Sequence, residues 1–504
     1  MVQSEFKEVR HFVAAKSWQG HSERFGNILN PATGEIQGQV QLADTEDITH
    51  AVDVAEQAFE TWSTTSPMAR AKVMYKFRDL VLAEIDSLAE VLSSEHGKTF
   101  SDAKGDILRG LDVVEFSCGI PHLLKGENSD LGDSGIDIRS YRMPLGVVAG
   151  ITPFNFPAMI PMWMFAVAVT CGNTFILKPS EKDPSVPMRL AQLLTEAGAP
   201  EGVLNVVNGD KVAVDAILNE PRIKAVSFVG STPIANYVYS TGTANGKRVQ
   251  AMGGAKNHAI ILPDANMDYV VDSMIGAAFG SAGERCMALP VAVPIGKRTA
   301  DEFIARIAPR IKKLDIAQPM LDKDMGPLVS AEHLARVKSY VDIGVEEGAD
   351  LVVDGRDFTM TEAGYEGGYY MGGCMFDNVT TDMRIYKEEI FGPVLSVVRA
   401  ETYEEAASLP TKHEYGNGVC LFTENGRIAQ HFATTVEVGM VGINVPIPVP
   451  LGFHTFGGWK NSAFGDHNQH GPEGVRFYTK VKTVTSRWPG SGSEGPEFSI
   501  PTHN

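Results

Sequence analysis

The stretch LGVVAGITPFNFPAMIPMWMFAVAVTCGNTFILKPSE, at residues 145–181, decides the fold. It carries no charge from Leu145 to Leu177, but prolines interrupt it three times. The longest piece without proline, residues 162–177, is shorter than the roughly 20 apolar residues that a transmembrane helix needs. We therefore expect no membrane span, and we predict a buried strand, a loop, a helix and a second buried strand.

Outward from this stretch, short β-branched runs alternate with helix-like segments such as 187–197 and 211–219. This βαβαβ order implies parallel strands joined by right-handed crossovers. A second alternating region, from Ser273 to about Gly442, predicts a second α/β domain. The strands expected in the first region are Val147–Ile151, Thr174–Leu177, Val203–Val207, Ala225–Val229 and Ala259–Leu262, and those in the second include Val291–Ile295 and Val394–Val398.

Three helices are expected before residue 125, because apolar residues recur there at helical spacing. They are Glu46–Trp62, with Thr45 as the candidate cap, Met68–His96 and Arg109–Leu124. Residues 125–135 are rich in Gly, Asp, Asn and Ser and are expected to form a loop. The tail 489–504, rich in Gly, Ser, Pro and Glu, is expected to be an extended end.

Composition narrows the class of protein. The 504 residues suggest about three domains. With 62 acidic and 44 basic residues the net charge is −18, so the chain should repel nucleic acids and anionic membranes. Five separated cysteines without a CxxC pair argue against a zinc ribbon and a disulfide framework. The N-terminus MVQSEFKEVRHF has no secretory or transit pattern, so we expect a reducing, cytoplasmic location, no nucleic-acid partner and no metal.

Two turns after expected strands could bind a dinucleotide. In the turn FVGST, backbone N–H groups near Gly230 and Ser231 could hold a pyrophosphate. In the turn LKPSE, Lys178 and Glu181 could bind ribose hydroxyls. Each signal is weak alone, because the first turn has a single glycine rather than GxGxxG and the second has the composition of an ordinary solvated turn.

Cys286 is the candidate nucleophile among the five cysteines. It follows a loop of small residues and stands directly after Arg285, so it could be an accessible thiolate. Most free cysteines are inert core residues, and on local sequence alone that alternative is the commoner one. The other four, Cys118, Cys171, Cys374 and Cys420, lie in apolar or glycine-rich contexts.

Six motifs occur in one order: TPFNFP at 152–157, LKPSE at 177–181, FVGST at 228–232, GGAK at 253–256, GERC at 283–286 and EEIFGPV at 388–394. Together they resemble the aldehyde dehydrogenase superfamily, from about Phe25 to Trp488. The resemblance implies an aldehyde-dehydrogenase-like α/β fold with a Rossmann-type NAD domain, an α/β catalytic domain and a small β bridging segment. The implied boundaries are 1–133 and 144–252 for the NAD-binding domain, 253–450 for the catalytic domain, 134–143 and 474–490 for the bridging segment, and 491–504 for the tail. In the family such bridging strands pair between subunits, so we expect a homodimer or homotetramer.

The resemblance assigns the chemistry to Cys286 and Asn155. Cys286 would attack the aldehyde to give a thiohemiacetal, and hydride transfer to NAD would leave a thioester on the cysteine. The side-chain amide of Asn155 and the backbone N–H of Cys286 would form an oxyanion hole, in which one donor is typically worth about 3–4 kcal/mol.

The resemblance also implies a set of NAD contacts. Lys178 and Glu181 would hold the adenosine ribose, and Glu389 or its neighbour Glu388 would bind the nicotinamide ribose. Glu181 would repel a 2′-phosphate, which favours NAD over NADP, although Lys182 beside it weakens the argument. The expected cofactor-binding residues are Thr152, Phe154, Lys178, Glu181, Lys182, Gly230, Ser231, Glu389 and Phe391.

One position departs from the hydrolytic members of the family, which carry a glutamate that activates water before the glycine-rich motif. Here residues 250–256 read QAMGGAK, which puts Met252, or Ala251 with a shift of one residue, at that place. Neither side chain can accept a proton, and general-base catalysis is typically worth about 10²–10⁴-fold. A thiol is then the better attacker, so coenzyme A is the expected co-substrate. The alternative is that Glu284 or Glu473 replaces the base.

Three further segments, 247–258, 285–288 and 477–488, resemble the CoA-acylating methylmalonate-semialdehyde dehydrogenase branch of the family. That branch converts malonate or methylmalonate semialdehyde to acetyl-CoA or propanoyl-CoA with loss of the carboxylate. Arg109 and Arg285 would hold this carboxylate, because a guanidinium binds a carboxylate bidentately. Decarboxylation is expected before CoA attack, because the carboxylate then lies β to the thioester carbonyl.

Two other classes of protein stay open. One is a hydrolytic NAD(P)-dependent aldehyde dehydrogenase that releases a free carboxylic acid. The other is a non-enzymatic protein on the same fold, against which the joint presence of Asn155, Cys286 and Glu389 argues. The motifs leave open the CoA-binding residues, the choice of semialdehyde and the pathway, whether valine, pyrimidine or inositol breakdown.

Overall fold

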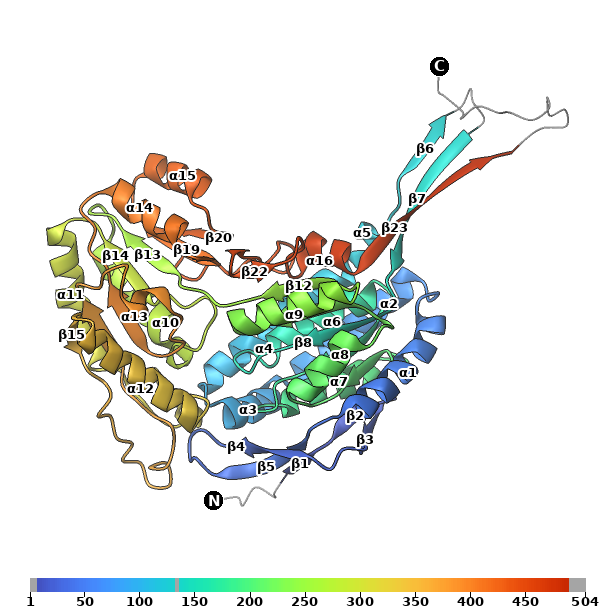
Figure 1. The fold of residues 1–504 in the computed structure, drawn as a ribbon, viewed down its shortest axis with the longest axis horizontal. Coiled ribbons are helices and arrows are strands. Elements are labelled where there is room, and N and C mark those ends of the chain that lie inside the picture. The colour runs from blue at the N-terminus through green and yellow to red at the C-terminus, as the bar shows by residue number, and fades with distance from the viewer. Residues whose placement is uncertain (1–6, 132–135, 489–504) are drawn as a thin grey trace.

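The computed structural model describes residues 7–131 and 136–488, and the predicted α/β class is confirmed. Figure 1 shows two large sheets with helices packed around them and a narrow sheet that projects from one side. The predicted tail 491–504 lies outside the described residues.

The first large sheet has eight strands, in the order β22-β12-β11-β8-β9-β10-β2-β3, and its five central strands are parallel. Helices α1 (Thr45–Trp62), α7 (Ser185–Glu196), α8 (Lys211–Asn219) and α9 (Thr232–Ala244) accompany it. Its strands are β2 (His11–Val13), β3 (Lys16–Trp18), β8 (Val147–Ile151), β9 (Thr174–Lys178), β10 (Leu204–Val206), β11 (Ile223–Val229), β12 (Arg248–Met252) and β22 (Ala463–Phe464).

The long uncharged stretch folds as predicted, into β8, a loop, α6 (Met159–Thr170) and β9. Every residue of α6 is buried, because the helix lies between the sheet and α4 (Phe100–Cys118). A helix covered on all sides needs no polar face, which explains its apolar composition. The loop between β8 and α6 carries Asn155 at the carboxyl end of the parallel strands, where α/β proteins place their ligands.

The second large sheet has seven strands, in the order β15-β16-β17-β14-β13-β19-β20, parallel except at β15. Helices α10 (Met267–Phe279), α11 (Lys297–Ile311), α12 (Ala331–Glu346), α14 (Tyr403–Lys412) and α15 (Gly426–Thr435) surround it (Figure 1). Its strands are β13 (His258–Ile261), β14 (Val291–Pro294), β15 (Asp350–Val353), β16 (Cys374–Asp377), β17 (Val394–Val397), β19 (Gly418–Phe422) and β20 (Met440–Ile443).

The projecting sheet consists of β6 (Asn128–Leu131), β7 (Ile136–Pro144) and β23 (Thr479–Arg487). β7 and β23 are antiparallel over their full length, so segments more than 300 residues apart in sequence form one hairpin-like arm. Two smaller sheets complete the described chain: β1 (Lys7–Val9), β5 (Ile36–Gln41) and β4 (Phe25–Leu29), and the pair β18 (Tyr415–Gly416) and β21 (Trp459–Lys460).

Several predicted element bounds were wrong. The predicted helix Met68–His96 is two helices, α2 (Pro67–Ala83) and α3 (Ile85–His96), because Glu84 between them leaves the helical conformation with φ −107° and ψ 13°. α1 is capped by Asp44, whose carboxylate accepts the N–H groups of Glu46 and Asp47, and not by Thr45.

Three other segments also differ from expectation. α4 starts at Phe100 rather than Arg109, because the Thr99 side chain caps it, and a short helix α5 (Ile120–Leu123) follows. Residues 128–131, expected in a loop, form strand β6. The strand expected at Ala259–Leu262 belongs to the second sheet, while β12, which was not predicted, takes its place in the first.

No helix within residues 7–131 and 136–488 is long and apolar enough to cross a membrane. The same residues contain no group of three or more His, Cys, Asp or Glu side chains placed to hold a metal ion.

Candidate active site

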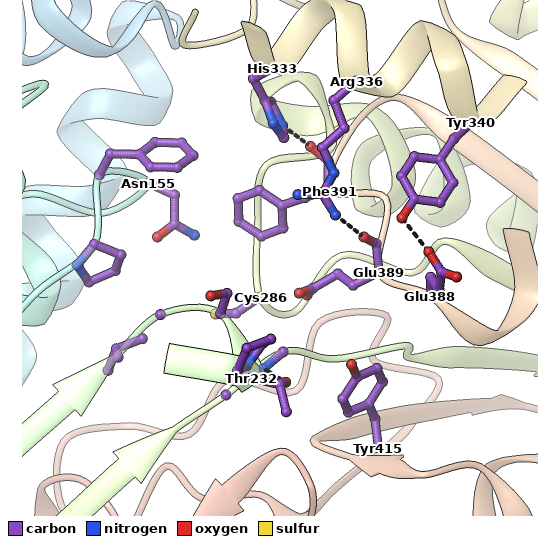
Figure 2. A pocket seen from close by; sticks show the side chains of 18 residues that line it. Asn155, Thr232, Cys286, His333, Arg336, Tyr340, Glu388, Glu389, Phe391 and Tyr415 are labelled. Atoms are coloured by element: carbon purple, nitrogen blue, oxygen red, sulfur yellow. Dashed lines mark hydrogen bonds between the residues drawn. The ribbon is translucent and has the colours of Figure 1, made fainter. Parts of the chain in front are cut away.

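A cavity of about 380 Å³ is bordered by loops from both large sheets. In the view of Figure 2, Asn155, Cys286 and Phe391 lie toward one end, and Tyr340, Glu388 and Tyr415 toward the other. The lining residues are Pro153, Phe154, Asn155, Val229, Gly230, Ser231, Thr232, Pro233, Gly253, Gly254, Cys286, His333, Arg336, Tyr340, Glu388, Glu389, Phe391 and Tyr415. Seven of the predicted site residues therefore come together: Phe154, Asn155, Gly230, Ser231, Cys286, Glu389 and Phe391.

Cys286 is half-buried, whereas the other four cysteines are buried. Its backbone carbonyl accepts hydrogen bonds from the side-chain amides of Asn257 (2.9 Å) and Asn417 (3.0 Å). Two segments of the second large sheet thus hold the backbone of the cysteine, so its thiol is placed by the fold rather than by a mobile loop.

The turn before Cys286 is held in an unusual conformation. Ser281, Ala282 and Gly283 have φ values of +53°, +51° and +74°. A side chain on Gly283 would place its Cβ 2.3 Å from the carbonyl oxygen of Gly392, so only glycine fits. Left-handed alanine and serine cost of order 1–2 kcal/mol each, and the surrounding structure must offset that cost.

The environment of Cys286 favours the neutral thiol. Burial raises its pKa to about 12, and the negative charge of Glu389 contributes to the same shift. A positive charge placed in the cavity would lower the pKa and favour the thiolate.

Asn155 is buried, and its side-chain amide donates a hydrogen bond to the backbone carbonyl of Glu284 (3.1 Å). This bond ties the loop after β8 to the segment that contains Cys286. An amide carries two N–H donors, so the second N–H of Asn155 remains for a ligand in the cavity that Asn155 and Cys286 both line.

The two neighbouring glutamates have different surroundings. Glu389 accepts the backbone N–H of Ala255 (3.0 Å), and burial raises its pKa to about 7. Glu388 instead accepts the hydroxyl of Tyr340 and pairs with Arg384, which hold its pKa below its usual range. Both line the cavity, but Glu389 is the one that bears on Cys286 electrostatically.

Aromatic rings form a wall beside Asn155 (Figure 2). The rings of Phe154 and Phe391 meet edge to face at 6.0 Å, and His333 lies 6.2 Å from Phe391. Phe391 has φ +62°, a strained value for a bulky residue, and its carbonyl is bound by the ring nitrogen of His333 at 2.6 Å.

The remaining predicted cofactor residues lie outside this cavity, at the carboxyl ends of the adjacent strands β8 and β9. The backbone N–H of Thr152 binds the carbonyl of Lys178, and the Lys178 ammonium lies 3.4 Å from the Glu181 carboxylate. The Lys182 ammonium lies over the ring of Phe154, 5.2 Å from its centre. The four residues thus share one edge of the sheet and connect to the cavity through Phe154.

The two predicted carboxylate-binding arginines do not line the cavity. Arg285 pairs with Asp102 (2.6 Å) and borders a small space behind Cys286. Arg109 pairs with Asp112 (3.0 Å) and donates to the carbonyl of Val449 (2.7 Å). Both guanidinium groups already have protein partners, so their binding of a substrate carboxylate stays a prediction.

The position at which hydrolytic members of the family carry a general base is occupied by Met252 and is apolar. Met252 ends β12, is 3% exposed and belongs to the same hydrophobic cluster as Met287. Glu284 is buried, accepts the backbone N–H of Val329, and has its pKa raised to about 8 by burial. Glu473 binds Arg476 and His467, and neither glutamate lines the cavity.

Several lining residues were missed by the sequence interpretation: Thr232, His333, Arg336, Tyr340 and Tyr415. His333, Arg336 and Tyr340 lie on α12 at three- and four-residue spacing, which places them on one helix face. Arg336 donates to the carbonyl of Glu389 (3.1 Å). That spacing was the available signal, but it is common on solvated helices and does not by itself indicate a site.

Two mostly parallel sheets thus border a cavity that contains a half-buried cysteine, an amide and two glutamates. The model described as "Aldehyde dehydrogenase family" matches residues 18–484, and the chain belongs to this family. The fold expected from the six motifs is thereby confirmed.

Within the family, several known proteins are similar to this chain in sequence and structure. Malonate-semialdehyde dehydrogenase of Pseudomonas aeruginosa is 54% identical, over 95% of this chain and 96% of the relative. A methylmalonate-semialdehyde dehydrogenase structure from Oceanimonas doudoroffii is 51% identical with a TM-score of 0.94, over 97% of this chain and 99% of that one. A Sinorhizobium meliloti structure, described as a methylmalonate-semialdehyde dehydrogenase in complex with NAD, is 59% identical with a TM-score of 0.95. The match covers 97% of this chain and 99% of that one.

Proposed function

We propose that the protein is an NAD-dependent, CoA-acylating dehydrogenase of malonate semialdehyde or methylmalonate semialdehyde. It oxidises the aldehyde through a thioester on Cys286, releases carbon dioxide, and transfers the acyl group to coenzyme A as acetyl-CoA or propanoyl-CoA. The names of the similar proteins support the substrate class. The observation that carries the proposal for this chain is the apolar Met252 where hydrolytic relatives have a base.

Met252 affects whether water or a thiol cleaves the thioester on Cys286. Where hydrolytic relatives carry the glutamate that deprotonates water, this chain has the thioether of Met252, which cannot accept a proton. A thiol such as coenzyme A is a strong nucleophile near neutral pH and needs less help. The arrangement therefore favours acyl transfer to a thiol over hydrolysis.

Cys286 would act as the nucleophile and Asn155 as the oxyanion donor. The Cys286 thiolate attacks the carbonyl carbon, and the amide of Asn155 stabilises the negative charge on the carbonyl oxygen. After oxidation, loss of the β-carboxylate as carbon dioxide places negative charge on the thioester oxygen, which the same amide can stabilise. The enolate carbon takes up a proton from water, which restores the thioester carbonyl. The thiolate of coenzyme A then attacks that carbonyl carbon and releases the Cys286 thiolate.

The chain offers a cradle that fits NAD. α9 begins at Thr232, and its cap residue Ser231 makes no side-chain capping bond, so the first turn of the helix could turn backbone N–H groups toward a pyrophosphate. The N–H of Gly230 is not one of them, because it donates to the carbonyl of Met252 (3.1 Å). A Cβ on Gly254 would lie 2.6 Å from the carboxylate of Glu389, so the glycine keeps the space beside that acid open. NAD, when bound there, accepts hydride from the substrate. We accordingly assign NAD binding to the eight-stranded sheet, which also supplies Asn155, and the nucleophile Cys286 to a loop of the seven-stranded sheet.

Arg109 and Arg285 are proposed to recognise the substrate carboxylate. Their present partners, Asp112 and Asp102, are held by exchangeable ion pairs near the surface or half-buried. The single carboxylate of the substrate could bind one edge of a guanidinium while the aspartate keeps the other edge. Replacing either arginine by methionine should raise KM for malonate semialdehyde more than KM for an uncharged aldehyde such as propanal.

NADH formation from malonate semialdehyde, with and without coenzyme A, tests the proposal. We expect sustained turnover only with coenzyme A, and acetyl-CoA and carbon dioxide as products. Sustained turnover without coenzyme A that yields a free acid would overturn the acylating assignment and favour the hydrolytic class. The same assay with methylmalonate semialdehyde decides between the two substrates through the ratio of their kcat/KM values.

A further inference from the structure

Lys98 and Asp106 form a buried ion pair beneath the loop that carries Asn155. Both side chains are 0% exposed, and the Lys98 ammonium lies 3.5 Å from the Asp106 carboxylate. Lys98 comes from the segment between α3 and α4, and Asp106 from α4. Removing two charges from water costs several kcal/mol, and a buried pair often contributes no net stability. Its presence therefore calls for a role besides holding the fold together.

The pair binds both ends of the segment Asn155–Met159. The Lys98 ammonium donates to the backbone carbonyl of Asn155 at 2.6 Å. The Asp106 carboxylate accepts the backbone N–H of Met159, the first residue of α6, at 2.7 Å. Ala158, the cap residue of α6, has no side chain that could do this, so Asp106 serves as the cap from another helix.

The bond from Lys98 fixes one peptide plane in particular. Because the carbonyl of Asn155 is held toward Lys98, the peptide after Asn155 cannot rotate freely. The ammonium also lies 4.2 Å from the centre of the Phe156 ring, which limits the movement of the next residue. Two restraints therefore orient the side-chain amide of Asn155. One is the backbone that Lys98 holds, and the other is the hydrogen bond from the amide to the Glu284 carbonyl.

We propose that Lys98 and Asp106 are positioning residues that orient Asn155 for stabilisation of the oxyanion. The inference rests on the proposed function, because it takes Asn155 as the oxyanion donor. A donor of this kind is effective only when it is held within a few tenths of an ångström of its working position. The ion pair supplies that restraint from outside the cavity, since neither member lines it.

The test is the double substitution Lys98→Met/Asp106→Leu. It replaces both charges by apolar side chains, so no lone charge is left buried and the protein should fold. We expect an unchanged KM for NAD and a fall of about 100-fold in the rate of NADH formation in the first turnover, because misplacement by about 1 Å can cost that much. A rate within twofold of wild type in the folded variant would overturn the proposal.

Lys247→Met is the matched control. Lys247 is also buried, and its ammonium donates to the backbone carbonyls of Glu220 and, at 3.0 Å, Ile223, between α8 and β11. The control removes the same kind of lysine–carbonyl bond away from Asn155. We expect its first-turnover rate to match wild type, and an equal loss in both variants would point to a general structural effect and overturn the positioning role.

The background Asn155→Ala separates this proposal from the proposed function. Asn155→Ala alone should lower the first-turnover rate, and adding Lys98→Met/Asp106→Leu should lower it no further, because the pair acts through Asn155. A further loss in that background would overturn the positioning role while leaving the oxyanion role of Asn155 intact. If Asn155→Ala alone left the rate unchanged, the oxyanion role and the inference that rests on it would both fail.

Discussion

At the residue scale, Cys286 lies in an environment that holds its proton. The pKa of its thiol is raised by burial and by Glu389, whose own pKa of about 7 means that it is largely ionised above neutral pH. Thiolate must nevertheless form for attack on an aldehyde. The protein groups around Cys286 therefore favour the thiol, and a positive charge such as the nicotinamide ring of NAD would lower the pKa and favour the thiolate.

The first prediction concerns Glu389→Gln. Above pH 7 the substitution removes a negative charge that raises the pKa of Cys286, so more thiolate is present at a given pH. We expect iodoacetamide to alkylate Cys286 about threefold faster in this variant at pH 8.5. Lowering the pKa of the thiol by about half a unit would raise the fraction of thiolate by that factor. The wild-type rate should still be rising at pH 10. Glu388→Gln is the control with an unchanged rate, because Glu388 is engaged by Tyr340 and Arg384; equal rates in all three proteins would contradict the assignment.

The second prediction concerns Met252→Glu. A carboxylate at this place would supply the missing general base, so NADH formation should become sustained without coenzyme A, with malonate or acetate as the free acid. The apolar surroundings of Met252 should raise the pKa of the new carboxyl and lower stability by about 1–3 kcal/mol. Met252→Gln has similar size without a base and should remain dependent on coenzyme A. If the glutamate and glutamine variants behaved alike, the water-activating role of this position would be disproved.

Individual site residues were predictable to different degrees. Asn155, Cys286, Gly230 and Glu389 stand in local motifs, and the cavity contains all four. His333 and Arg336 come from a helix face with no distinctive local sequence, so their place follows only from how α12 packs. The sequence could not distinguish Glu388 from Glu389; both line the cavity, and the binding of the nicotinamide ribose by Glu389 stays a prediction.

At the element scale, the strands and the uncharged stretch were predicted well because burial dictates their composition. β8, α6 and β9 follow in the expected order, and the predicted α8 has the observed bounds. Helix ends were less predictable, because single side chains such as Asp44 and Thr99 decide them. β12 escaped prediction since its central position in the sheet, between β11 and β22, is set by distant segments.

The third prediction concerns the left-handed turn that precedes the cysteine. Gly283→Ala would force a Cβ against the Gly392 carbonyl at φ +74°, so the two segments must separate. We expect a loss of about 2 kcal/mol or more in the free energy of unfolding and at least a tenfold loss of kcat. Urea unfolding and NADH formation measure the two effects.

Gly276→Ala is the control for this turn. Gly276 lies within α10, with an ordinary helical φ and open space where a Cβ would stand. Alanine there should increase stability by about 0.5–1 kcal/mol and leave kcat unchanged. If both glycine variants behaved alike, the special geometry of the turn before Cys286 would not matter.

At the scale of the whole molecule, strands near the C-terminus pair with strands from much earlier in the chain. β22, near residue 463, pairs with β12 beside Met252, and β23 pairs with β7 across more than 300 residues. Local patterns predict the elements but not these long-range closures, since the partners are far apart in sequence. The association of residues 134–143 with the strand-like tail was inferred from family resemblance. Within the described residues, β7 pairs with β23, and residues 134 and 135 lie outside them.

The projecting arm leads to the last prediction. One face of β7 and β23 exposes Tyr141, Met143 and Val484 among the charged side chains of Arg139, Lys480 and Lys482. A narrow three-stranded sheet with uncovered apolar side chains is not expected to be stable in water. We propose that a second copy of the chain covers it, as in a homodimer or homotetramer. Tyr141→Glu/Val484→Glu should then lower the mass measured by sedimentation toward the 54.5 kDa of one chain. Val345→Glu, at an exposed position on α12 far from the arm in Figure 1, should leave the mass unchanged; a monomeric wild-type protein would refute the proposal.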